Sequence, residues 1–469
     1  MQTRPLGGLK DKRLTQRGNS LLNRLLSIGG QSIRQLATND SQAKAFYRFL
    51  TNKNVSQRDI IHSMATNCQA CVADRPLLCI QDSSEINLAN HRNRLKKDDS
   101  IGLTDGTKQG LGFFIHPSLV IDAETFMPYG LADVKVWNRS HEWVDKAPTY
   151  QRCKLPIEQK ESYKWIETSL HTKQALPTAQ QLIIIQDREG DLYEQFCLVP
   201  DQQTHLLIGA KTNRVLADKT KLFEHLAGQA QQGSYTLELA GDKRRKTTKR
   251  TATLAIRFSA VTLSRNQFTA KTVADRVNLY AVEAREITPK QKMSQEVTSP
   301  IHWRLLTTWP VNSLADALQC LDWYSCRWLI EEVFRIVKKE GFDMEASELT
   351  QGKAIRKLCL LILETIIKLF IRQAANASQQ ELPASCCFSQ AEQTCMELQM
   401  PHLEANTQKL KNPYTPSTLK RYIWVIARLG GWKGYQSERS PGITTVWLGL
   451  KRFNAVYSGF NLGGDLSRR

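Results

Sequence analysis

The chain has 469 residues, 41% of them hydrophobic, so it is long enough for two or three domains and apolar enough to form a core. This composition excludes an intrinsically disordered chain. Its 64 Lys and Arg residues against 45 Asp and Glu residues leave a formal net charge of +19, which favours a polyanionic partner. Nucleic acid is the first candidate, and an anionic membrane surface is the second.

No segment has the pattern of a membrane span or a signal peptide. The most apolar run, LCLLILETIIKLFI at 358–371, is short for a bilayer and contains Glu364 and Lys368. The start, MQTRPLGGLKDKR, has no apolar signal region. The 11 cysteines are scattered, often within apolar runs, which is typical of free thiols in a reducing compartment. CQAC at 68–71 has no second pair of ligands for zinc. These features predict a cytoplasmic protein with no membrane partner.

Residues 1–70 form the first predicted domain, an N-terminal helical DNA-binding domain. LLNRLLSIG, SQAKAFYRFLTN and VSQRDIIHSMATNC read as short helices, the second capped within the NDS run at 39–41 and the third by Asn54. Short basic helices joined by tight turns are typical of DNA-binding modules and also of small helical bundles. Tyr47 and Arg48 are the candidate DNA contacts here, and core packing is the alternative for Tyr47.

From residue 75 the pattern changes to strands and helices, and residues 71–372 form the second predicted domain. The expected strands include PLLCIQDSSEI, two joined around 122–124 in GLGFFIHPSLVIDAETFMPYGLADVKVW, QLIIIQD and HLLIGAK, with a helix around 158–170. A β-rich insertion containing DKRRKTTKR is expected at about 215–300. HWRLLTTWPV then leads to a helix that Ser313 caps. This order predicts an α/β fold.

Two acidic residues share one context in this region. Asp82 follows LLCIQ and Asp187 follows LIIIQ, each at the C-terminal end of a buried strand, where ligand sites of α/β sheets gather. A carboxylate held beside apolar walls is costly to ionise unless a cation compensates it. With Glu331 from a later helix, three carboxylates and phosphate oxygens could hold two Mg²⁺ ions. A turn or cap residue is the alternative for any single Asp after a strand.

The segment WYSCRWLIEEVFRIVKKE at 323–340 reads as one amphipathic helix. Steps of three, four and seven residues place four polar side chains on one face: Tyr324, Arg327, Glu331 and Lys338. A solvated helix face is the alternative. These residue types nevertheless suit a phosphate with a metal ion, and they favour Glu331 over the adjacent Glu332 as the ligand.

These residues resemble the signature of bacterial cut-and-paste DDE transposases, the family of the transposase of transposon five. The family motif Tyr-x2-Arg-x3-Glu-x6-Lys is matched by the four residues of the helix. Asp82 in IQDSSEINL matches the first acid of the family, and Asp187 in QDREGDLYEQF matches the second. The likeness extends to AFYRFLTNKNVS, WRLLTTWPV and ARLGGW and so covers nearly the whole chain.

The resemblance implies a ribonuclease-H-like catalytic core with a β-rich insertion, flanked by helical N- and C-terminal domains. It implies that Asp82, Asp187 and Glu331 are the catalytic ligands of two Mg²⁺ ions, for which Mn²⁺ can substitute. The implied reaction cleaves the ends of a transposon in double-stranded DNA through a hairpin and joins the freed 3′-OH ends to target DNA. Three residues are implied to bind phosphates near the cut: Tyr324, Arg327 and Lys338.

Further DNA contacts are implied by the same resemblance. Trp303 matches a tryptophan that stacks on a flipped base, and a core tryptophan on a strand is the alternative. Lys211 and Arg214 match a basic DNA-contact segment. Arg188 follows Asp187 in the DRE match, where a salt bridge within the sheet is the alternative.

Residues 373–469 form the third predicted domain, which is helical. In TTVWLGLKRFNAVYSGF, five residues are spaced as one helical stripe: Trp447, Leu450, Phe453, Asn454 and Tyr457. The family uses its last helix for dimerisation, so a homodimer on two transposon ends is expected, with plain packing as the alternative. The resemblance also implies a bacterial, nucleoid-associated protein.

Two other functions are compatible with parts of this pattern. One is a catalytically inactive DNA-binding form that acts as an inhibitor, and the other is a related metal-dependent nuclease without strand transfer. The presence of all three acids favours the transposase over the inactive form.

Overall fold

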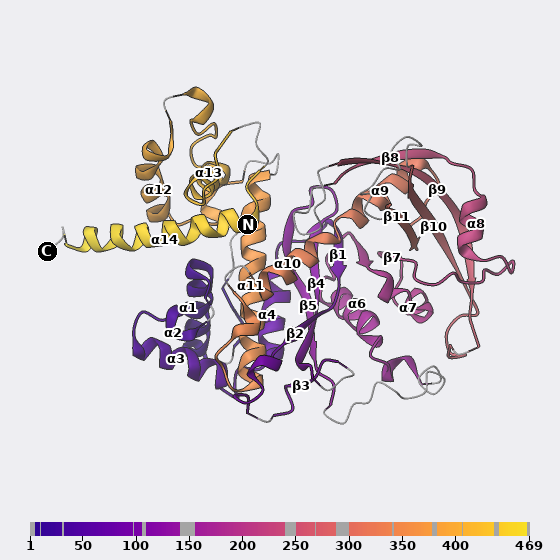
Figure 1. Cartoon of the computed structure of the whole chain (residues 1–469), viewed down its shortest axis with the longest axis horizontal. Coiled ribbons are helices and arrows are strands. Elements are labelled where there is room, and N and C mark those ends of the chain that lie inside the picture. Colours follow the sequence, from indigo (N-terminus) through magenta and orange to yellow (C-terminus); the bar gives the residue numbers. More distant parts are fainter. Residues whose placement is uncertain are drawn as a thin grey trace. The chain divides into compact units, whose positions relative to one another are not determined.

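A computed structural model of the protein describes residues 5–9, 11–30, 32–96, 98–105, 109–140, 155–239, 250–267, 269–287, 300–339, 342–377, 382–405, 407–435 and 440–466. The chain divides into two compact units (Figure 1). The first comprises Met1–Ala73, Ser83–Val144 and Glu331–Arg469, and the second comprises Asp74–Asp82 and Asp145–Ile330.

The first unit begins with short helices, as the sequence predicts. They are α1 (Lys12–Ile28), α2 (Ile33–Leu36), α3 (Asp40–Thr51) and α4 (Gln57–Gln69). The Asn39 side chain accepts a hydrogen bond from a backbone N–H of α3, so the cap predicted within 39–41 is confirmed. The cap predicted at Asn54 is wrong, because Ser56 and Asp59 form a reciprocal capping box at the start of α4.

The strands of the first unit are antiparallel. β4 (Leu111–Asp122) pairs with β2 (Ser84–Asn87), β3 (Gly102–Leu103) and β5 (Pro128–Trp137). β4 is buried along its whole length. The Asp122 carboxylate accepts the N–H groups of Glu124 and Thr125 in the turn that follows, which confirms the two strands predicted around this turn. A 3-10 turn, η1 (Ala89–His91), follows β2.

The helix α11 (Gly352–Ala377) contains the most apolar run and packs against β5, α4 and α13 (Leu419–Leu429) of its unit. It contains buried charges: Lys368 and Glu364 are 3.6 Å apart, and Lys357 Nζ donates to the Asn52 carbonyl at 2.8 Å. Within the described ranges, no helix combines the length and apolar character needed to cross a bilayer.

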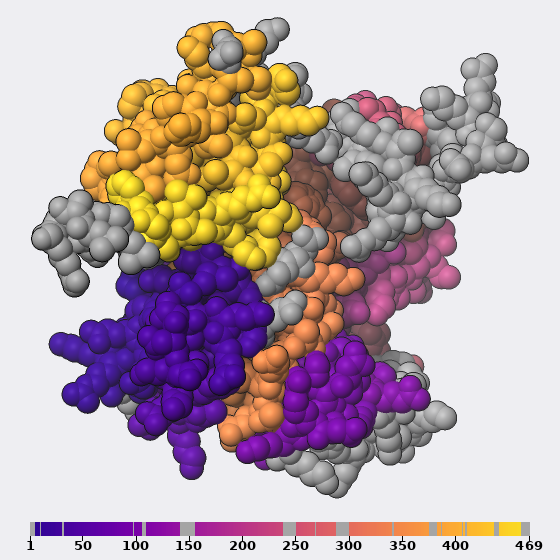
Figure 2. Space-filling view, turned by 60° about the vertical axis from the view of Figure 1, so that its left-hand side comes forward, coloured from indigo at the N-terminus to yellow at the C-terminus, as the bar shows by residue number. Residues whose placement is uncertain are grey.

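The first unit is completed by α12 (Gln390–Leu403), α13 (Leu419–Leu429), α14 (Ile443–Leu466) and the 3-10 turns η4 (Met344–Ala346), η5 (Ala384–Cys386) and η6 (Gln408–Leu410). α14 contacts α1, α11 and α13, and its yellow surface meets the indigo N-terminal helices in Figure 2. Trp447, Leu450 and Phe453 are buried, and the Asn454 amide donates to the Ser27 carbonyl. This part of the predicted stripe therefore packs within its own unit.

The second unit contains a sheet whose strands lie in the order β1 (Pro76–Gln81), β6 (Gln181–Gln186), β7 (Thr204–Gly209), β11 (His302–Thr307), β10 (Arg276–Glu286), β9 (Arg250–Ser264) and β8 (Gly233–Leu239). β1, β6 and β7 are parallel, and the later strands pair antiparallel. The strands predicted from PLLCIQ, QLIIIQ and HLLIGAK are confirmed. β8, β9 and β10 confirm the β-rich insertion; its basic run lies outside the described residues except for Arg250.

The helices of the second unit are α6 (Tyr163–Ala175), α7 (Tyr193–Leu198), α8 (Leu222–Gly228) and α9 (Leu314–Ser325), with the 3-10 turns η2 (Ile157–Gln159) and η3 (Arg188–Gly190). The predicted Ser313 cap is confirmed, because Ser313 and Asp316 form a capping box at α9. The helix expected around 158–170 is α6, which begins at Tyr163.

The single helix predicted over 323–340 is wrong. α9 ends at Ser325 and α10 (Trp328–Lys338) begins after a break, where the N–H groups of Cys326 and Arg327 bond to carbonyls three residues back. The 3.6-residue spacing cannot reveal this break, because apolar positions continue through it. Within 323–340, the residues up to Ile330 belong to the second unit and those from Glu331 to the first.

The buried ammonium of Lys357 predicts a rise in stability with pH. Burial lowers its pKa to about 8, so above that pH the unfolded chain retains a proton that the folded chain has released. The wild-type free energy of unfolding, relative to a Lys357→Met variant, should increase by about 3 kcal/mol between pH 7 and pH 10.5. Urea denaturation of both proteins at several pH values measures this difference. If the difference between the two free energies of unfolding stays constant with pH, the pKa of Lys357 is not lowered by burial.

Candidate active site

The first two predicted acids follow neighbouring strands at one edge of the second unit's sheet. β1 and β6 are parallel, and Gln81 is paired with Gln186, so Asp82 and Asp187 come directly after paired positions. Adjacent strands lie about 4.8 Å apart, which makes these two backbone positions neighbours. The Asp82 carboxylate is 3.3 Å from the Arg327 guanidinium. The structure thus brings Asp82, Asp187 and Arg327 of the predicted site to one edge.

Asp187 is partly desolvated at the end of β6. Burial raises the pKa of its carboxyl, and the N–H of Glu189, which donates to Asp187 Oδ1 at 2.8 Å, partly opposes this effect. The nearby charges of Arg327 and Lys164 also lower this pKa, whereas the charge of Glu189 raises it. The protein therefore compensates the carboxylate incompletely, as expected of a group that binds a cation.

A pocket of about 340 Å³ opens beside Asp187. Its lining contains both polar and aromatic side chains: Asp187, Arg188, Trp303, Tyr324, Ser325, Arg327 and Trp328. The rings of Trp303 and Tyr324 meet edge to face, with centroids 5.7 Å apart. Trp303 is half-buried. This arrangement offers a carboxylate, cations and aromatic faces to one ligand.

Trp328, which lines this pocket, and Gly209, which lies next to Tyr324, were not singled out from the sequence. Trp328 lines it with 57% of its surface exposed, because the break after α9 places it at the start of a new helix. Gly209, at the end of β7, allows the close approach of Tyr324: a Cβ there would lie 2.8 Å from the Tyr324 hydroxyl. The sequence CRW points to Trp328 only once the helix break is known.

Arg188 and Tyr324 differ in how firmly the protein holds them. Arg188 is exposed, and its guanidinium donates to the His302 carbonyl at 3.5 Å. The Tyr324 ring is buried, and this burial raises the pKa of its hydroxyl. Tyr324 is therefore a neutral hydroxyl within reach of the pocket, whereas Arg188 contributes a solvated positive charge.

The predicted basic segment after β7 is held by an acid that the sequence did not single out. Asp191 accepts the backbone N–H groups of Lys211 and Thr212 at 2.9 and 3.2 Å. Its buried carboxylate also binds the Arg214 guanidinium at 2.7 Å. Arg214 consequently fixes the segment, while the side chain of Lys211 is exposed.

Glu331 and Lys338 belong to the first unit, as part of α10. Glu331 is exposed and Lys338 is half-buried. The adjacent Glu332 forms an ion pair with Arg335. Across the part of the chain that the structure describes, no three His, Cys, Asp or Glu side chains form a group that could hold a metal ion. Of the three predicted acids, Asp82 and Asp187 belong to the second unit and Glu331 to the first.

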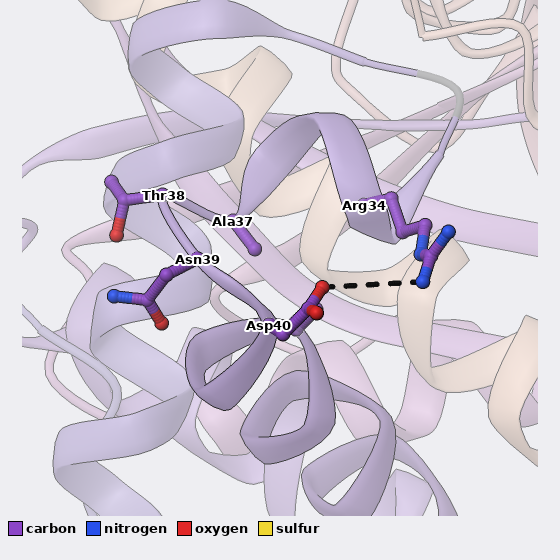
Figure 3. Close-up of a pocket in the computed structure, with 6 residues that line it drawn as sticks. Arg34, Ala37, Thr38, Asn39 and Asp40 are labelled. Carbon is purple, nitrogen blue, oxygen red and sulfur yellow. Dashed lines mark ion pairs between the residues drawn. The ribbon is translucent and has the colours of Figure 1, made fainter.

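Tyr47 and Arg48 lie on α3, where Tyr47 is half-buried and Arg48 is exposed. A shallow hollow of about 430 Å³ lies at the start of the same helix (Figure 3). Its lining residues are Arg34, Ala37, Thr38, Asn39, Asp40 and Ala43. Arg34 and Asp40 are largely exposed and 3.9 Å apart, so their ion pair is weak.

Two family models match the chain. Residues 8–55, which include α1, α2 and α3, match the transposase DNA-binding family. Residues 184–366, which include Asp187 and Glu331, match the transposase DDE domain. Asp82 lies outside the matched segment. These matches support a DNA transposase, an enzyme that acts on DNA and whose domain type uses divalent metal ions.

One solved structure with a partly similar trace is the cryo-EM structure of piggyBac transposase synaptic complex with hairpin DNA. The two sequences are 8% identical. The match covers 86% of this chain and 76% of the piggyBac transposase chain, with a TM-score of 0.37. A likeness this weak supports no conclusion about function. The predicted fold class is confirmed by the mixed α/β units with helical terminal regions and by the DDE-domain match, whose fold is ribonuclease-H-like.

The contact between Gly209 and Tyr324 can be tested by a double-variant cycle. Gly209→Ala adds a methyl group beside the Tyr324 hydroxyl and should lower the free energy of unfolding by about 1–3 kcal/mol. Tyr324→Phe removes that hydroxyl, so it should cost less stability in the Gly209→Ala background than in the parent. Urea denaturation of the four proteins measures the coupling, and strictly additive effects contradict the close approach.

Lys211 and Arg214 should behave differently when each is replaced by alanine. Arg214→Ala leaves the buried Asp191 without its cation and should lower the free energy of unfolding by about 3 kcal/mol. Lys211→Ala should keep the free energy of unfolding within about 0.5 kcal/mol of the wild-type value. It should lower the slope of the logarithm of the DNA-binding constant against the logarithm of the salt concentration by about 1, the value expected for the loss of one phosphate contact. Thermal unfolding and DNA binding at several salt concentrations measure both effects. Equal losses of stability contradict the distinction.

Proposed function

We propose that the protein is a divalent-metal-dependent DNA transposase that cleaves double-stranded DNA at transposon ends through a hairpin and joins the 3′-OH ends to target DNA. The observation that supports this proposal best is the site at the edge of the second unit's sheet. Asp82 and Asp187 follow paired positions of parallel strands, with Arg327 beside Asp82 and the pocket beside Asp187. The same proposal relates the chain to the transposase of transposon five and assigns it the Tyr-Arg-Glu-Lys signature of that family.

The residues at this edge fit divalent metal ions. Carboxylate oxygens are the ligands that Mg²⁺ and Mn²⁺ prefer, and the raised pKa of Asp187 indicates a carboxylate that lacks a full countercharge. Asp82, Asp187 and, from the first unit, Glu331 are the proposed ligands of two Mg²⁺ ions. When bound, such ions supply a metal-activated nucleophile and stabilise the leaving oxygen of an in-line displacement at phosphorus.

The cationic and hydroxyl groups of the pocket would bind the DNA phosphates next to the cut. Arg327 can pair bidentately with a phosphate, and the neutral Tyr324 hydroxyl can donate a hydrogen bond to a phosphate oxygen. Arg188 adds positive charge on the exposed side of the pocket. Lys338, the last residue of α10, is proposed as a further phosphate contact. These groups would fix the scissile phosphate against the carboxylates.

The aromatic side chains suit the hairpin step. Closing a hairpin on duplex DNA strains the terminal bases, and an unstacked base gains about 1–3 kcal/mol by stacking on an aromatic ring. Trp303 is half-buried, and its ring is held edge to face against Tyr324. Trp328 offers a second, largely exposed ring in the same pocket. One or both rings would receive the unstacked base.

The rest of the chain is assigned by the same proposal. Residues 1–70 would bind DNA through contacts such as Tyr47 and Arg48, and Lys211 would contact DNA beside the active site. Residues 71–372 would form the catalytic domain, and residues 373–469 would support a homodimer that holds two ends. The net charge of +19 favours this polyanionic partner. The protein would act in the bacterial cytoplasm, associated with the nucleoid.

The three acids should be essential for cleavage. Asp82→Asn, Asp187→Asn and Glu331→Gln should each lower the rate of Mg²⁺-dependent cleavage by about a thousandfold or more, because each removes a metal ligand. The substrate is a duplex that carries the sequences flanking the coding region of the chain. Glu332→Gln is the matched control, since Glu332 is the adjacent carboxylate and pairs with Arg335. Cleavage by any of the three acid variants at the control rate would show that the metal site is assigned wrongly.

Two assays separate this function from its alternatives. An inactive, inhibitory form would bind the end duplex without cleaving it in Mg²⁺ or Mn²⁺. A related nuclease would cleave the duplex but would not join its 3′-OH ends to a target plasmid. Cleavage with hairpin intermediates, followed by joining, is the result expected of a cut-and-paste transposase.

A further inference from the structure

Beneath the two acids of the second unit lies a cluster of buried amides that the proposed chemistry does not use. The amide cluster consists of Gln81 on β1, Ser169 on α6, Gln186 on β6 and Gln195 on α7, all with 0% exposure. Gln81 and Gln186 immediately precede Asp82 and Asp187 in the sequence. The cluster therefore joins the two strands that end in the acids to two helices of the same unit.

The hydrogen bonds of the cluster centre on Gln186. Its Nε2 donates to Gln81 Oε1 at 2.7 Å and to Ser169 Oγ at 3.2 Å. Its Oε1 accepts a short hydrogen bond from Gln195 Nε2. The Ser169 hydroxyl, which is within 3.2 Å of Gln81 Oε1, lies 2.7 Å from the Trp165 carbonyl. All the hydrogen-bonding atoms of the Gln186 amide are thus engaged.

This fixed amide lies directly against the turn that contains Asp187. Gly190 ends η3, the turn capped by the Asp187 side chain. A Cβ on Gly190 would lie 2.2 Å from Gln186 Oε1 and 2.9 Å from Gln186 Cβ. The turn therefore rests on the Gln186 side chain with no space for a methyl group. The Gln186 amide is therefore in a position to hold the backbone next to Asp187 in place.

Stability alone does not account for the cluster. The residues before the two glutamines, such as Ile80 and Ile185, are apolar and fully buried. Gln81 Nε2 and Gln195 Oε1 have no hydrogen-bond partner among the described residues, and each such group costs about 1–3 kcal/mol. A leucine or methionine at these positions would avoid that cost. A satisfied central amide with unsatisfied ends indicates a positioning role that outweighs the loss of stability.

We propose that the amide cluster positions Asp82 and Asp187 for divalent metal binding, with Gln186 as its central positioning residue. The parallel pairing of β1 and β6 sets the height of the two acids along the sheet. The cluster then fixes the position of the turn that contains Asp187 and links this turn to the end of β1. This inference rests on the proposed metal-dependent function.

Gln186→Met tests the proposal, because methionine keeps the length of the side chain and removes its hydrogen bonds. The matched control is Gln393→Met, which replaces another buried glutamine, bonded to the Phe388 carbonyl in the first unit. Mn²⁺ alone is titrated into each full-length protein, and free Mn²⁺ is measured by electron paramagnetic resonance. Gln186→Met should weaken Mn²⁺ binding by about tenfold, as is typical of residues that orient metal ligands, whereas Gln393→Met should not change it.

Gly190→Ala provides a second test if Gln186→Met does not fold. Its methyl group must displace the turn from the Gln186 amide, so Mn²⁺ binding should again weaken by about tenfold. In end cleavage, the folded variant should need more Mn²⁺ for half-maximal rate and should approach the wild-type rate at saturating Mn²⁺. A merely structural role predicts lower thermal stability with unchanged Mn²⁺ affinity, and that result overturns the proposal.

Asp187→Asn separates failure of this inference from failure of the proposed function. If Asp187→Asn binds Mn²⁺ as the wild type does, the metal site itself is assigned wrongly, and the positioning role of the amide cluster is excluded as well. If Asp187→Asn loses Mn²⁺ binding while Gln186→Met and Gly190→Ala retain the wild-type affinity, the metal site stands and only the role of the amide cluster is excluded.

Discussion

The candidate site depends first on the parallel pairing of β1 with β6. Because Gln81 is paired with Gln186, the two strands end at the same height, and Asp82 and Asp187 become neighbours although more than a hundred residues separate them. A slip of one residue in this register would turn one glutamine out of the buried cluster and move its aspartate along the edge. The apolar residues of both strands, buried on each side, specify the register.

Around this edge, buried and partly buried charges are held by specific partners. Arg327 binds Asp82, and Asp191 binds Arg214 together with two backbone N–H groups. Such pairs add little to net stability, because desolvation offsets their attraction, but removing one partner is costly. They therefore act mainly by fixing geometry. Asp187 differs from them, since burial raises its pKa and the protein leaves its charge incompletely compensated.

Several features of the site could be predicted because they depend on local sequence. The strands ending in Asp82 and Asp187 follow from short apolar runs, and the cap of α9 at Ser313 follows from a serine three residues before an aspartate. Other features could not. The break between α9 and α10 leaves the apolar spacing intact, and the use of Arg214 to hold its loop requires knowing where Asp191 lies.

The sequence by itself determined the α/β class, the two strands that end in acids, and the residue types suited to DNA phosphates, because strand and helix periodicity and chemical identity are local properties. Only the tertiary structure decided which side chains are available to a ligand. It packed Trp447 and Phe453 inside their unit, exposed Trp328, and buried Gln186 beneath Gly190. Burial and partner choice arise from contacts between distant segments, and no local pattern records them.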